Sequence, residues 1–375
     1  MAKHVRHANL ARLAGAGLMV ALTLGSVAAA GQASGRPVAG PAAAADTFVT
    51  AAAHGDADTV ERFLASGGSV DAPNRDGFTA LMWAAGQGHA TLVDRLLAVG
   101  ADVNAQSADH TTALMAAASR GQTAIAQQLL TNGARVDARR ADGWTALIWA
   151  AAEGREAAVR LLLARGAHIE AADPRGFTAL VYAAADVMEE KPTARTLGVV
   201  ETLLAGGARI DHRAADGSTA LMAAAAKGEE AIVRTLLAQG ADVHLRDARG
   251  RTPLMHAADE RGTAAIADAL LAQRAELDAR DASGTTALML AAARTRAGML
   301  RGLLAHGAAV DAADGRGRTA LMRAAELGRV DAVKALLQAG ADPARLDTAG
   351  RTAADFARDN RQNYILALLG ARSAR

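Results

Sequence analysis

The stretch DGWTALIWAAAEGREAAVRLLLARGAHIEAAD, from Asp142 to Asp173, decides the fold because versions of it recur along the chain. Aligning the copies on the Thr-Ala-Leu that begins at Thr145 gives threonines spaced by 33, 33, 33, 41, 33, 34, 33 and 33 residues. These threonines are Thr79, Thr112, Thr145, Thr178, Thr219, Thr252, Thr286, Thr319 and Thr352. Self-similarity at one fixed period is typical of a repeat protein, in which each unit packs against its neighbours.

Each copy predicts two helices followed by an extended return. Thr145 can cap the first helix, because its hydroxyl accepts a hydrogen bond from a backbone N–H that lacks a partner within the helix. Gly154 and Gly166 would end the two helices in the left-handed conformation that glycine adopts at little cost. Residues 167–176 then return to the next copy through a tight turn at 173–176. The predicted order is helix, turn, helix, hairpin.

This pattern resembles the ankyrin repeat, whose signature is about 33 residues with a Thr-Pro-Leu-His core. The core here reads Thr-Ala-Leu-Met in most copies and Thr-Pro-Leu-Met in the one at Thr252. The second helix and its exit match closely, as in VDRLLAVGADVNA from Val93 to Ala105. An apolar residue replaces the family histidine, so the sequence does not predict the polar bridge that this histidine usually makes between repeats. The resemblance implies an all-α ankyrin-repeat solenoid of about ten helix-turn-helix-hairpin units, including both caps.

The first thirty residues are a different kind of sequence. Basic residues precede an apolar run from Leu13 to Val27, and three alanines follow before Gly31. That order predicts a secretory signal peptide over residues 1–30 and a periplasmic or secreted protein. The alternative is a short membrane anchor, but the run is shorter than the roughly 20 apolar residues that a span needs. We therefore expect no stable membrane span after signal removal. The chain has no cysteine, which excludes a lipoprotein anchor and disulfides.

The rest of the chain divides by composition and by how well each copy matches the repeat. The predicted segments are a flexible Ala/Pro/Gly linker at 31–45 and a repeat domain at 46–375, made of an N-cap at 46–74, eight full repeats at 75–347 and a C-cap at 348–375. The one real insertion, at 186–198, is either a tolerated surface excursion or a specific contact loop. Three copies lose a repeat glycine, at His110, Arg274 and Thr295, which predicts backbone strain there.

Charge and motifs exclude several classes of function. The chain has 41 basic and 39 acidic residues, and three of the basic ones precede Gly31, so the mature chain would carry a formal charge of −1. This balance does not support a nucleic-acid partner or a membrane surface. Equivalent positions in adjacent repeats lie roughly 10 Å apart, so His212 and His244 are poor candidates for one metal site. The loose G-x-G-x-x-A at 315–320 falls at a hairpin tip and does not follow a buried strand. We expect no enzyme, no catalytic residue, no cofactor and no metal.

The aromatic residues gather at two repeat positions. One position is the residue just before the repeat threonine, at the hairpin tip, and the other is the fourth residue after it, on the first helix. They hold the pairs Phe78 and Trp83, Trp144 and Trp149, and Phe177 and Tyr182, six of the ten aromatic residues in the chain. The intervening copy has Thr111 and Ala116. In ankyrin repeats these positions line the concave groove where partners usually bind.

Two interpretations of these aromatic residues stay open. The helix residues Trp83, Trp149 and Tyr182 are either interface anchors or core fillers. The turn is expected to place the tip residues Phe78, Trp144 and Phe177 near solvent, where grouped aromatic side chains are typical of anchors. Farther along, the tip position becomes basic at Arg251 and Arg318, and these arginines are either part of the groove or solvated charges.

The sequence therefore predicts an exported, monomeric, non-catalytic scaffold that binds an unidentified protein partner through the concave face of the solenoid. The expected partner-binding residues are Phe78, Trp83, Thr111, Trp144, Trp149, Phe177, Tyr182, Arg251 and Arg318. The alternative is a secreted effector that engages a host protein, and an enzyme with an unrecognised site is a weaker third candidate.

Overall fold

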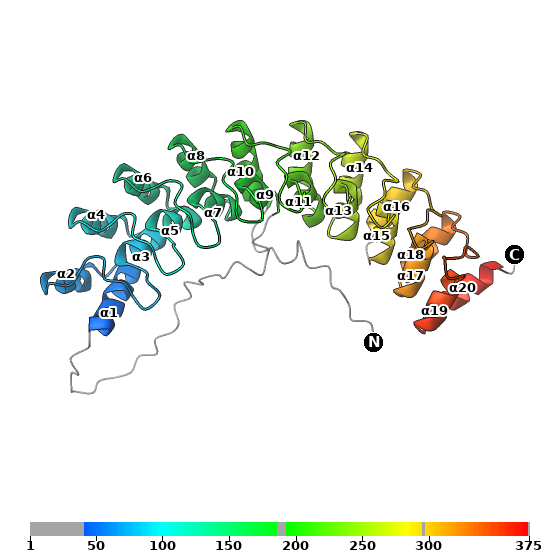
Figure 1. Cartoon of the computed structure of the whole chain (residues 1–375), viewed down its shortest axis with the longest axis horizontal. Coiled ribbons are helices and arrows are strands. Elements are labelled where there is room, and N and C mark those ends of the chain that lie inside the picture. The colour runs from blue at the N-terminus through cyan, green and yellow to red at the C-terminus, as the bar shows by residue number, and fades with distance from the viewer. Residues whose placement is uncertain (1–40, 186–192, 295–296, 374–375) are drawn as a thin grey trace. The chain divides into compact units, whose positions relative to one another are not determined.

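The structure of the protein is a computed structural model that describes residues 41–185, 193–294 and 297–373, and these residues form twenty helices. The helices come in ten pairs, which confirms the predicted all-α repeat architecture (Figure 1). The first helices of the pairs are α1 (Pro41–His54), α3 (Ala80–Gln87), α5 (Ala113–Arg120), α7 (Ala146–Ala152), α9 (Ala179–Ala184), α11 (Ala220–Lys227), α13 (Pro253–Asp259), α15 (Ala287–Ala293), α17 (Ala320–Glu326) and α19 (Ala353–Asp359). The second helices are α2 (Ala57–Ala65), α4 (Ala90–Ala98), α6 (Thr123–Thr131), α8 (Glu156–Ala164), α10 (Thr193–Ala205), α12 (Glu230–Ala238), α14 (Ala264–Ala272), α16 (Ala297–Ala305), α18 (Val330–Gln338) and α20 (Asn363–Ser373).

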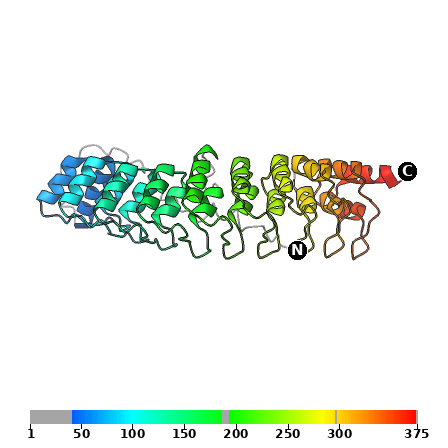
Figure 2. The same ribbon diagram turned by 90° about the horizontal axis from the view of Figure 1, so that it is seen from above.

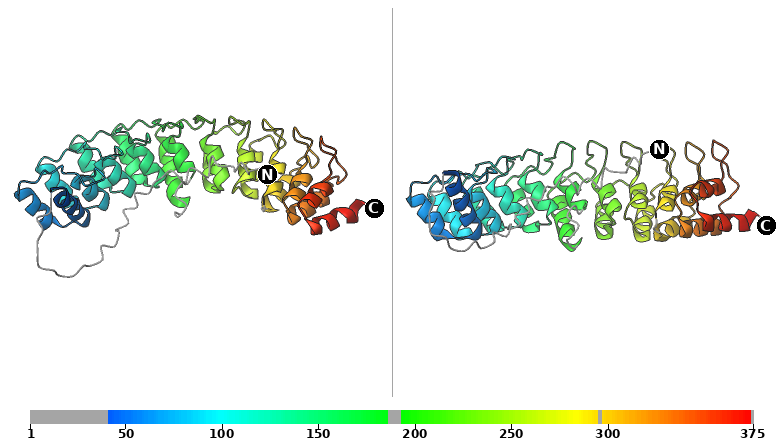
Figure 3. Two further views of the ribbon diagram at one scale, coloured as in Figure 1. Left: turned by 60° about the horizontal axis from the view of Figure 1, so that its bottom comes forward. Right: turned by 90° about the horizontal axis from the view of Figure 1, so that it is seen from below.

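The described residues fall into two compact units. The first unit contains 41–174 and 193–208, and the second contains 175–185, 209–294 and 297–373. Within each unit the first helices pack on one another and the second helices form an adjoining row, as for α3 on α5 in the first unit and α11 on α13 in the second. In each unit the turns that link successive repeats project to one side of these rows (Figures 2 and 3).

The repeat threonines cap the first helices as the sequence predicts. The Thr145 hydroxyl accepts a hydrogen bond of 3.3 Å from the Ile148 N–H, and Thr79 accepts one of 3.4 Å from Met82. Thr178 is an exception, because its side chain makes no such bond. The caps fix where each first helix begins, and this sets the register of the helix against the preceding turn.

The predicted left-handed positions are confirmed where the structure describes them. Gly154 and Gly166 have φ of 65° and 81°, and the substituted copies keep the same conformation, with φ of 64° at both His110 and Arg274. A side chain in this region costs on the order of 1 kcal/mol, so these two turns are strained. Arg361, with φ of 58°, is a third such residue that the sequence analysis missed. Thr295 lies outside the described residues.

Two predicted boundaries are wrong in part. Helix α1 begins at Pro41, so residues 41–45, expected in the linker, are helical, and Ala45 is buried. Proline suits the first turn of a helix, and the alanines that follow are the best helix formers, so packing against α3 holds them in a helix. Likewise, residues 193–198 of the expected insertion form the start of α10. Residues 1–40, including the predicted signal peptide, lie outside the described residues, as do 186–192.

The N-terminal cap is joined to the next repeat through Asp46. The Asp46 carboxylate of α1 accepts a hydrogen bond of 3.2 Å from the Arg75 backbone N–H and pairs with Arg75 Nε at 3.0 Å. Below it, Phe48 stacks on Phe63 with ring centroids 4.3 Å apart. The polar contacts therefore join α1 to the turn before the next repeat, and the stacked rings join α1 to α2 within the first pair.

Backbone and arginine hydrogen bonds tie successive turns together. The Ala108 N–H donates to the Asp76 carbonyl at 3.2 Å, and the Ala141 N–H donates to the Asp109 carbonyl at 3.0 Å. Arg139 adds a side-chain bridge, because its guanidinium donates to its own turn at Gly143 and, at 2.8 Å, to the carbonyl of Ala172 in the next repeat. Arg213, Arg246 and Arg280 make the equivalent bridge in the second unit. Arginines thus supply polar bridges between repeats that the sequence analysis did not predict.

Candidate partner-binding surface

Two residues of each repeat form a surface that we call the inner face of each unit. One is the residue before the repeat threonine, and the other is the first-helix residue four positions after that threonine. The aromatic pairs at these positions meet edge to face. Ring centroids lie 6.0 Å apart for Phe78 and Trp83, and 4.8 Å apart for Trp144 and Trp149. In the second unit, Phe177 and Tyr182 lie 5.9 Å apart. Each turn therefore folds back over the first helix and brings its aromatic residue onto the helix residue.

The expected exposure of the tip residues is wrong for two of the three. Trp144 is 7% exposed and Phe177 is 4% exposed, while Phe78 is half-buried. The turn packs its side chain down against the first helix, and the large apolar area of an aromatic ring favours that burial. Trp144 and Phe177 are therefore core residues, and truncating them would remove packing.

The helix residues divide between the two interpretations left open by the sequence. Tyr182 is 1% exposed and its hydroxyl accepts a hydrogen bond of 2.6 Å from Arg175, so it is a core filler. Trp83 and Trp149 are half-buried, and each presents part of its indole to solvent. Between them in the repeat series lie Thr111 and Ala116, which are also half-buried. Together with Phe78, Trp83 and Trp149 form the partly exposed aromatic surface of the first unit.

An ion-paired arginine completes this surface. Arg140 lies 5.6 Å from the ring centroid of Trp149, in the range of a cation–π contact, and pairs with Asp109 at 3.0 Å and with Asp142 at 3.7 Å. Burial alone would raise the pKa of Asp109, but hydrogen bonds from two hydroxyls and the Arg140 charge outweigh it and lower the pKa. Asp109 is therefore ionised at neutral pH. Arg140 was not among the predicted residues, although it replaces the aspartate found five residues before the repeat threonine in several other copies.

One polar atom of the surface has no partner in the described residues. The indole N–H of Trp83 is buried and makes no hydrogen bond. An unsatisfied buried donor costs about 1–3 kcal/mol, so this group favours a state that provides an acceptor. Sequence reasoning could not find it, because the indole orientation depends on packing.

Arg251 and Arg318 are ion-paired and are not free solvated charges. Arg251 is paired with Asp259 at 2.8 Å, and Asp259 is also paired with Arg294 at 2.6 Å. Arg318 is paired with Asp314 at 3.3 Å. The side chains of Arg251 and Arg318 are 13% and 22% exposed. Of the two interpretations of these arginines, the one with free solvated charges is wrong.

Aspartates with buried side chains recur at one repeat position, and two of them, Asp281 and Asp314, pair with Arg251 and Arg318. Asp247, Asp281, Asp314 and Asp347 each lie five residues before a repeat threonine. Asp247 pairs with buried His256 at 3.0 Å. For Asp314, burial acts to raise the pKa, but backbone N–H groups and two arginines lower it overall, so the carboxylate is ionised. The sequence contains this signal, and aligning the copies one residue position at a time would have revealed it. These carboxylates offset the positive charge expected at the C-terminal groove.

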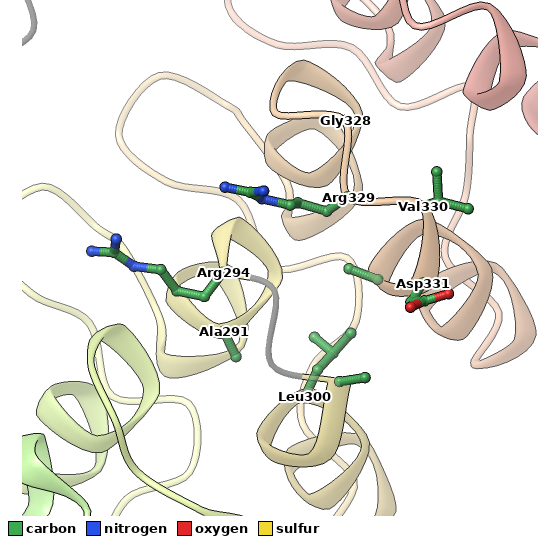
Figure 4. A pocket seen from close by; sticks show the side chains of 9 residues that line it. Ala291, Arg294, Leu300, Gly328, Arg329, Val330 and Asp331 are labelled. Atoms are coloured by element: carbon green, nitrogen blue, oxygen red, sulfur yellow. The ribbon is translucent and has the colours of Figure 1, made fainter.

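A pocket of about 260 Å³ lies in the second unit between the α15–α16 and α17–α18 pairs. Figure 4 shows that Arg294 and Arg329 extend away from Asp331 across it. Arg294 binds Asp259, and Arg329 Nε donates to the Ala293 carbonyl at 3.0 Å. The remaining lining is largely alanine and other aliphatic side chains.

Metal sites and membrane-spanning helices are both absent from the residues that the structure describes. Within 41–185, 193–294 and 297–373 no group of three or more His, Asp or Glu side chains is placed to hold a metal ion. None of the helices in these ranges has the length and hydropathy that a membrane span requires.

The nine predicted partner-binding residues are divided between the two units. Phe78, Trp83, Thr111, Trp144 and Trp149 belong to the first, and Phe177, Tyr182, Arg251 and Arg318 belong to the second. The first unit brings Trp83 and Trp149 to a partly exposed surface, with Thr111 and Phe78 beside them in the repeat series. The second unit buries its two aromatic residues and pairs its two arginines.

Comparison with known proteins supports the same architecture. A family model described as ankyrin repeats matches residues 48–140, 114–197, 192–281 and 260–347. The crystal structure of the ankyrin repeat domain of Bcl-3, titled a unique member of the IkappaB protein family, is similar to this chain. The identity is 30% and the TM-score 0.50, and the match covers 60% of this chain and 97% of the Bcl-3 chain. A search of curated proteins finds no match.

Proposed function

Because the chain belongs to the ankyrin repeat family, whose repeats are scaffolds for protein–protein interaction, we propose that it is an exported, non-catalytic scaffold that binds a partner protein. The partner contacts the inner face of the first unit. One observation carries this proposal: aromatic residues are only 3% of the chain, yet two tryptophans lie partly exposed at equivalent inner-face positions. Tryptophan is enriched among the residues that dominate binding energy at interfaces.

The partner-binding set is smaller than the sequence predicts. Phe78, Trp83, Thr111 and Trp149 are at least partly accessible and can contact a partner directly. Trp144 acts indirectly, because its ring supports Trp149 from below at 4.8 Å. In the second unit, Arg251 and Arg318 are held by buried carboxylates and leave fewer donors for a partner.

Truncating Trp149 tests the binding surface. The Trp149→Ala variant is expected to weaken partner binding by about 2 kcal/mol, or roughly thirtyfold, measured on the purified partner by calorimetry. Val99→Ala is the matched control, because Val99 is an exposed apolar residue that follows the second helix α4, away from the inner face. Equal binding by the parent chain and the Trp149 variant would contradict the proposed surface.

Export rests on the N-terminal segment. We expect the mature chain to begin at Gly31, since the basic, apolar and alanine segments come in the order that signal peptidase recognises. The intact mass of the protein recovered from the periplasm or the medium measures this directly. A soluble cytoplasmic protein that retains Met1 would contradict it. Recovery from the medium, and not from the periplasm, would favour the second candidate, a secreted effector that engages a host protein.

A further inference from the structure

Three carboxylates line the turns above the aromatic surface of the first unit. Asp76, Asp109 and Asp142 occupy one repeat position, three residues before the repeat threonine, in three successive repeats. The backbone hydrogen bonds from Ala108 to Asp76 and from Ala141 to Asp109 hold these turns in register. Successive carboxylates are therefore about one repeat, or roughly 10 Å, apart. All three side chains are at least partly exposed.

The third repeat shows what fits between two of these carboxylates. The Arg140 guanidinium lies between Asp109 and Asp142, at 3.0 and 3.7 Å, and over the Trp149 indole. The geometry combines a charge-assisted pair with a cation–π contact, and both favour a guanidinium. We call the space between two of these successive carboxylates a slot. In the third repeat, the slot between Asp109 and Asp142 is filled by the chain's own Arg140.

The second repeat has the same slot without the cation. The residue equivalent to Arg140 is Ser107, whose hydroxyl donates to Asp109 at 2.6 Å. Asp76, on the other side of the slot, is exposed, and its carboxylate makes no hydrogen bond or ion pair within the described residues. The first-helix residue is the small Ala116, between the repeats that carry Trp83 and Trp149. The slot between Asp76 and Asp109 therefore has carboxylates on both sides and partly exposed indoles in the neighbouring repeats, but no arginine at the position of Arg140.

The surrounding positive charges do not fill the slot. Arg75 is turned to Asp46 at 3.0 Å, and Arg140 is held by Asp109 and Asp142. Arg139 donates to the carbonyls of Gly143 and Ala172, on the side of its turn toward the next repeat. Arg120 is in the last turn of α5, at the opposite end of this helix from the turns that carry the carboxylates. The rim formed by Asp76, Asp109 and Asp142 therefore keeps an excess of negative charge. Such an excess steers and selects a positively charged partner.

We propose that the partner of the first unit is a basic protein segment, one of whose arginine or lysine side chains lies between Asp76 and Asp109. The alkyl stem of this side chain packs over Ala116 beside Trp83, as long basic side chains do on apolar surfaces. The inference rests on the proposed function and adds the chemistry of the partner to it. We take the positively charged partner to be a polypeptide, because the aromatic surface below the rim can pack against apolar side chains on either side of the basic one.

Two fluorescein-labelled eight-residue peptides test the proposal on the full chain. One alternates arginine with serine, and the other alternates glutamate with serine. Anisotropy at 50 mM salt is expected to show binding of the arginine peptide that weakens at 300 mM salt, and no binding of the glutamate peptide. Asp76→Asn is expected to weaken the arginine peptide about fivefold, which corresponds to about 1 kcal/mol for one exposed ion pair. Its thermal midpoint should not change, because the Asp76 side chain makes no bond.

Two controls decide the outcome. Asp94→Asn removes the same charge from an exposed residue of α4 and should leave peptide binding unchanged. Ser107→Arg supplies the cation from within the chain, as Arg140 does, and should compete with the peptide. The proposal is overturned if both peptides bind equally, if neither binds, or if Asp76→Asn and Asp94→Asn have the same effect. A partner that needs Trp149 but not Asp76 would overturn this inference and leave the proposed function standing.

Discussion

Replacing Trp144 with alanine is expected to lower the free energy of unfolding by about 3–5 kcal/mol, the usual cost of truncating a buried tryptophan. The Trp144 side chain is 7% exposed, and its ring packs on Trp149 with centroids 4.8 Å apart. Truncation therefore leaves a cavity under the turn and removes the support of Trp149. Denaturant unfolding followed by circular dichroism measures the loss.

Phe78 provides the matched control for this prediction. It occupies the same turn position but is half-buried, so Phe78→Ala should cost less than Trp144→Ala. If the Trp144 variant unfolds at the same denaturant concentration as the parent chain, the ring is at the surface. The original expectation from the sequence, with Trp144 as an exposed anchor, would then be restored.

Asp259→Ala is expected to cost about 3 kcal/mol at pH 7, because it leaves two arginines without their common partner. The Asp259 side chain is 8% exposed and binds Arg251 at 2.8 Å and Arg294 at 2.6 Å. Arg294 is the more exposed of the two arginines, so water compensates part of its loss. Urea unfolding of the variant and the parent chain gives the difference.

The pH dependence of that difference follows from the pKa of Asp259. Burial alone would raise this pKa, but the hydrogen bond and charge of Arg294 and the charge of Arg251 outweigh it, so the pKa is lowered in the folded state. A lowered pKa stabilises the fold above the ordinary aspartate pKa, and the stabilisation is lost as the pH falls toward the folded value. The cost of Asp259→Ala should therefore shrink between pH 7 and pH 3.

A double variant separates the ion pair from the packing. Arg251→Met combined with Asp259→Leu removes the carboxylate and the more buried of its two arginines and keeps similar volume, so it should recover part of the stability lost by Asp259→Ala. A cost for Asp259→Ala below about 1 kcal/mol at pH 7, or one that does not change with pH, would contradict the role given to this cluster.

The repeat fold could be predicted because its signals are local. Thr145 caps its own helix, and Gly154 ends the same helix, so neither residue needs a distant partner to reveal its role. The start of α1 could not be predicted, since alanines near Ala45 suit both a linker and a helix. Packing against α3 decides between the two.

The candidate site was harder to predict than the fold, because packing decides where its side chains lie. The position of Trp144 in the sequence shows that it belongs to a turn, but not that the turn folds its ring onto Trp149. The pair of Asp259 and Arg294 joins residues 35 positions apart, so no local pattern reveals it. By contrast, Arg318 and Asp314 are four residues apart, and the sequence did contain that pair.

The central claim is that a partner protein contacts the inner face of the first unit. Site-specific photocrosslinking in cells that produce the protein tests it most directly, with benzoylphenylalanine placed at Asp142 on the rim or at Arg160 on the exposed face of α8. We predict one discrete crosslinked species from position 142 and none from position 160. A crosslinked species from position 160, with none from position 142, would contradict the claim.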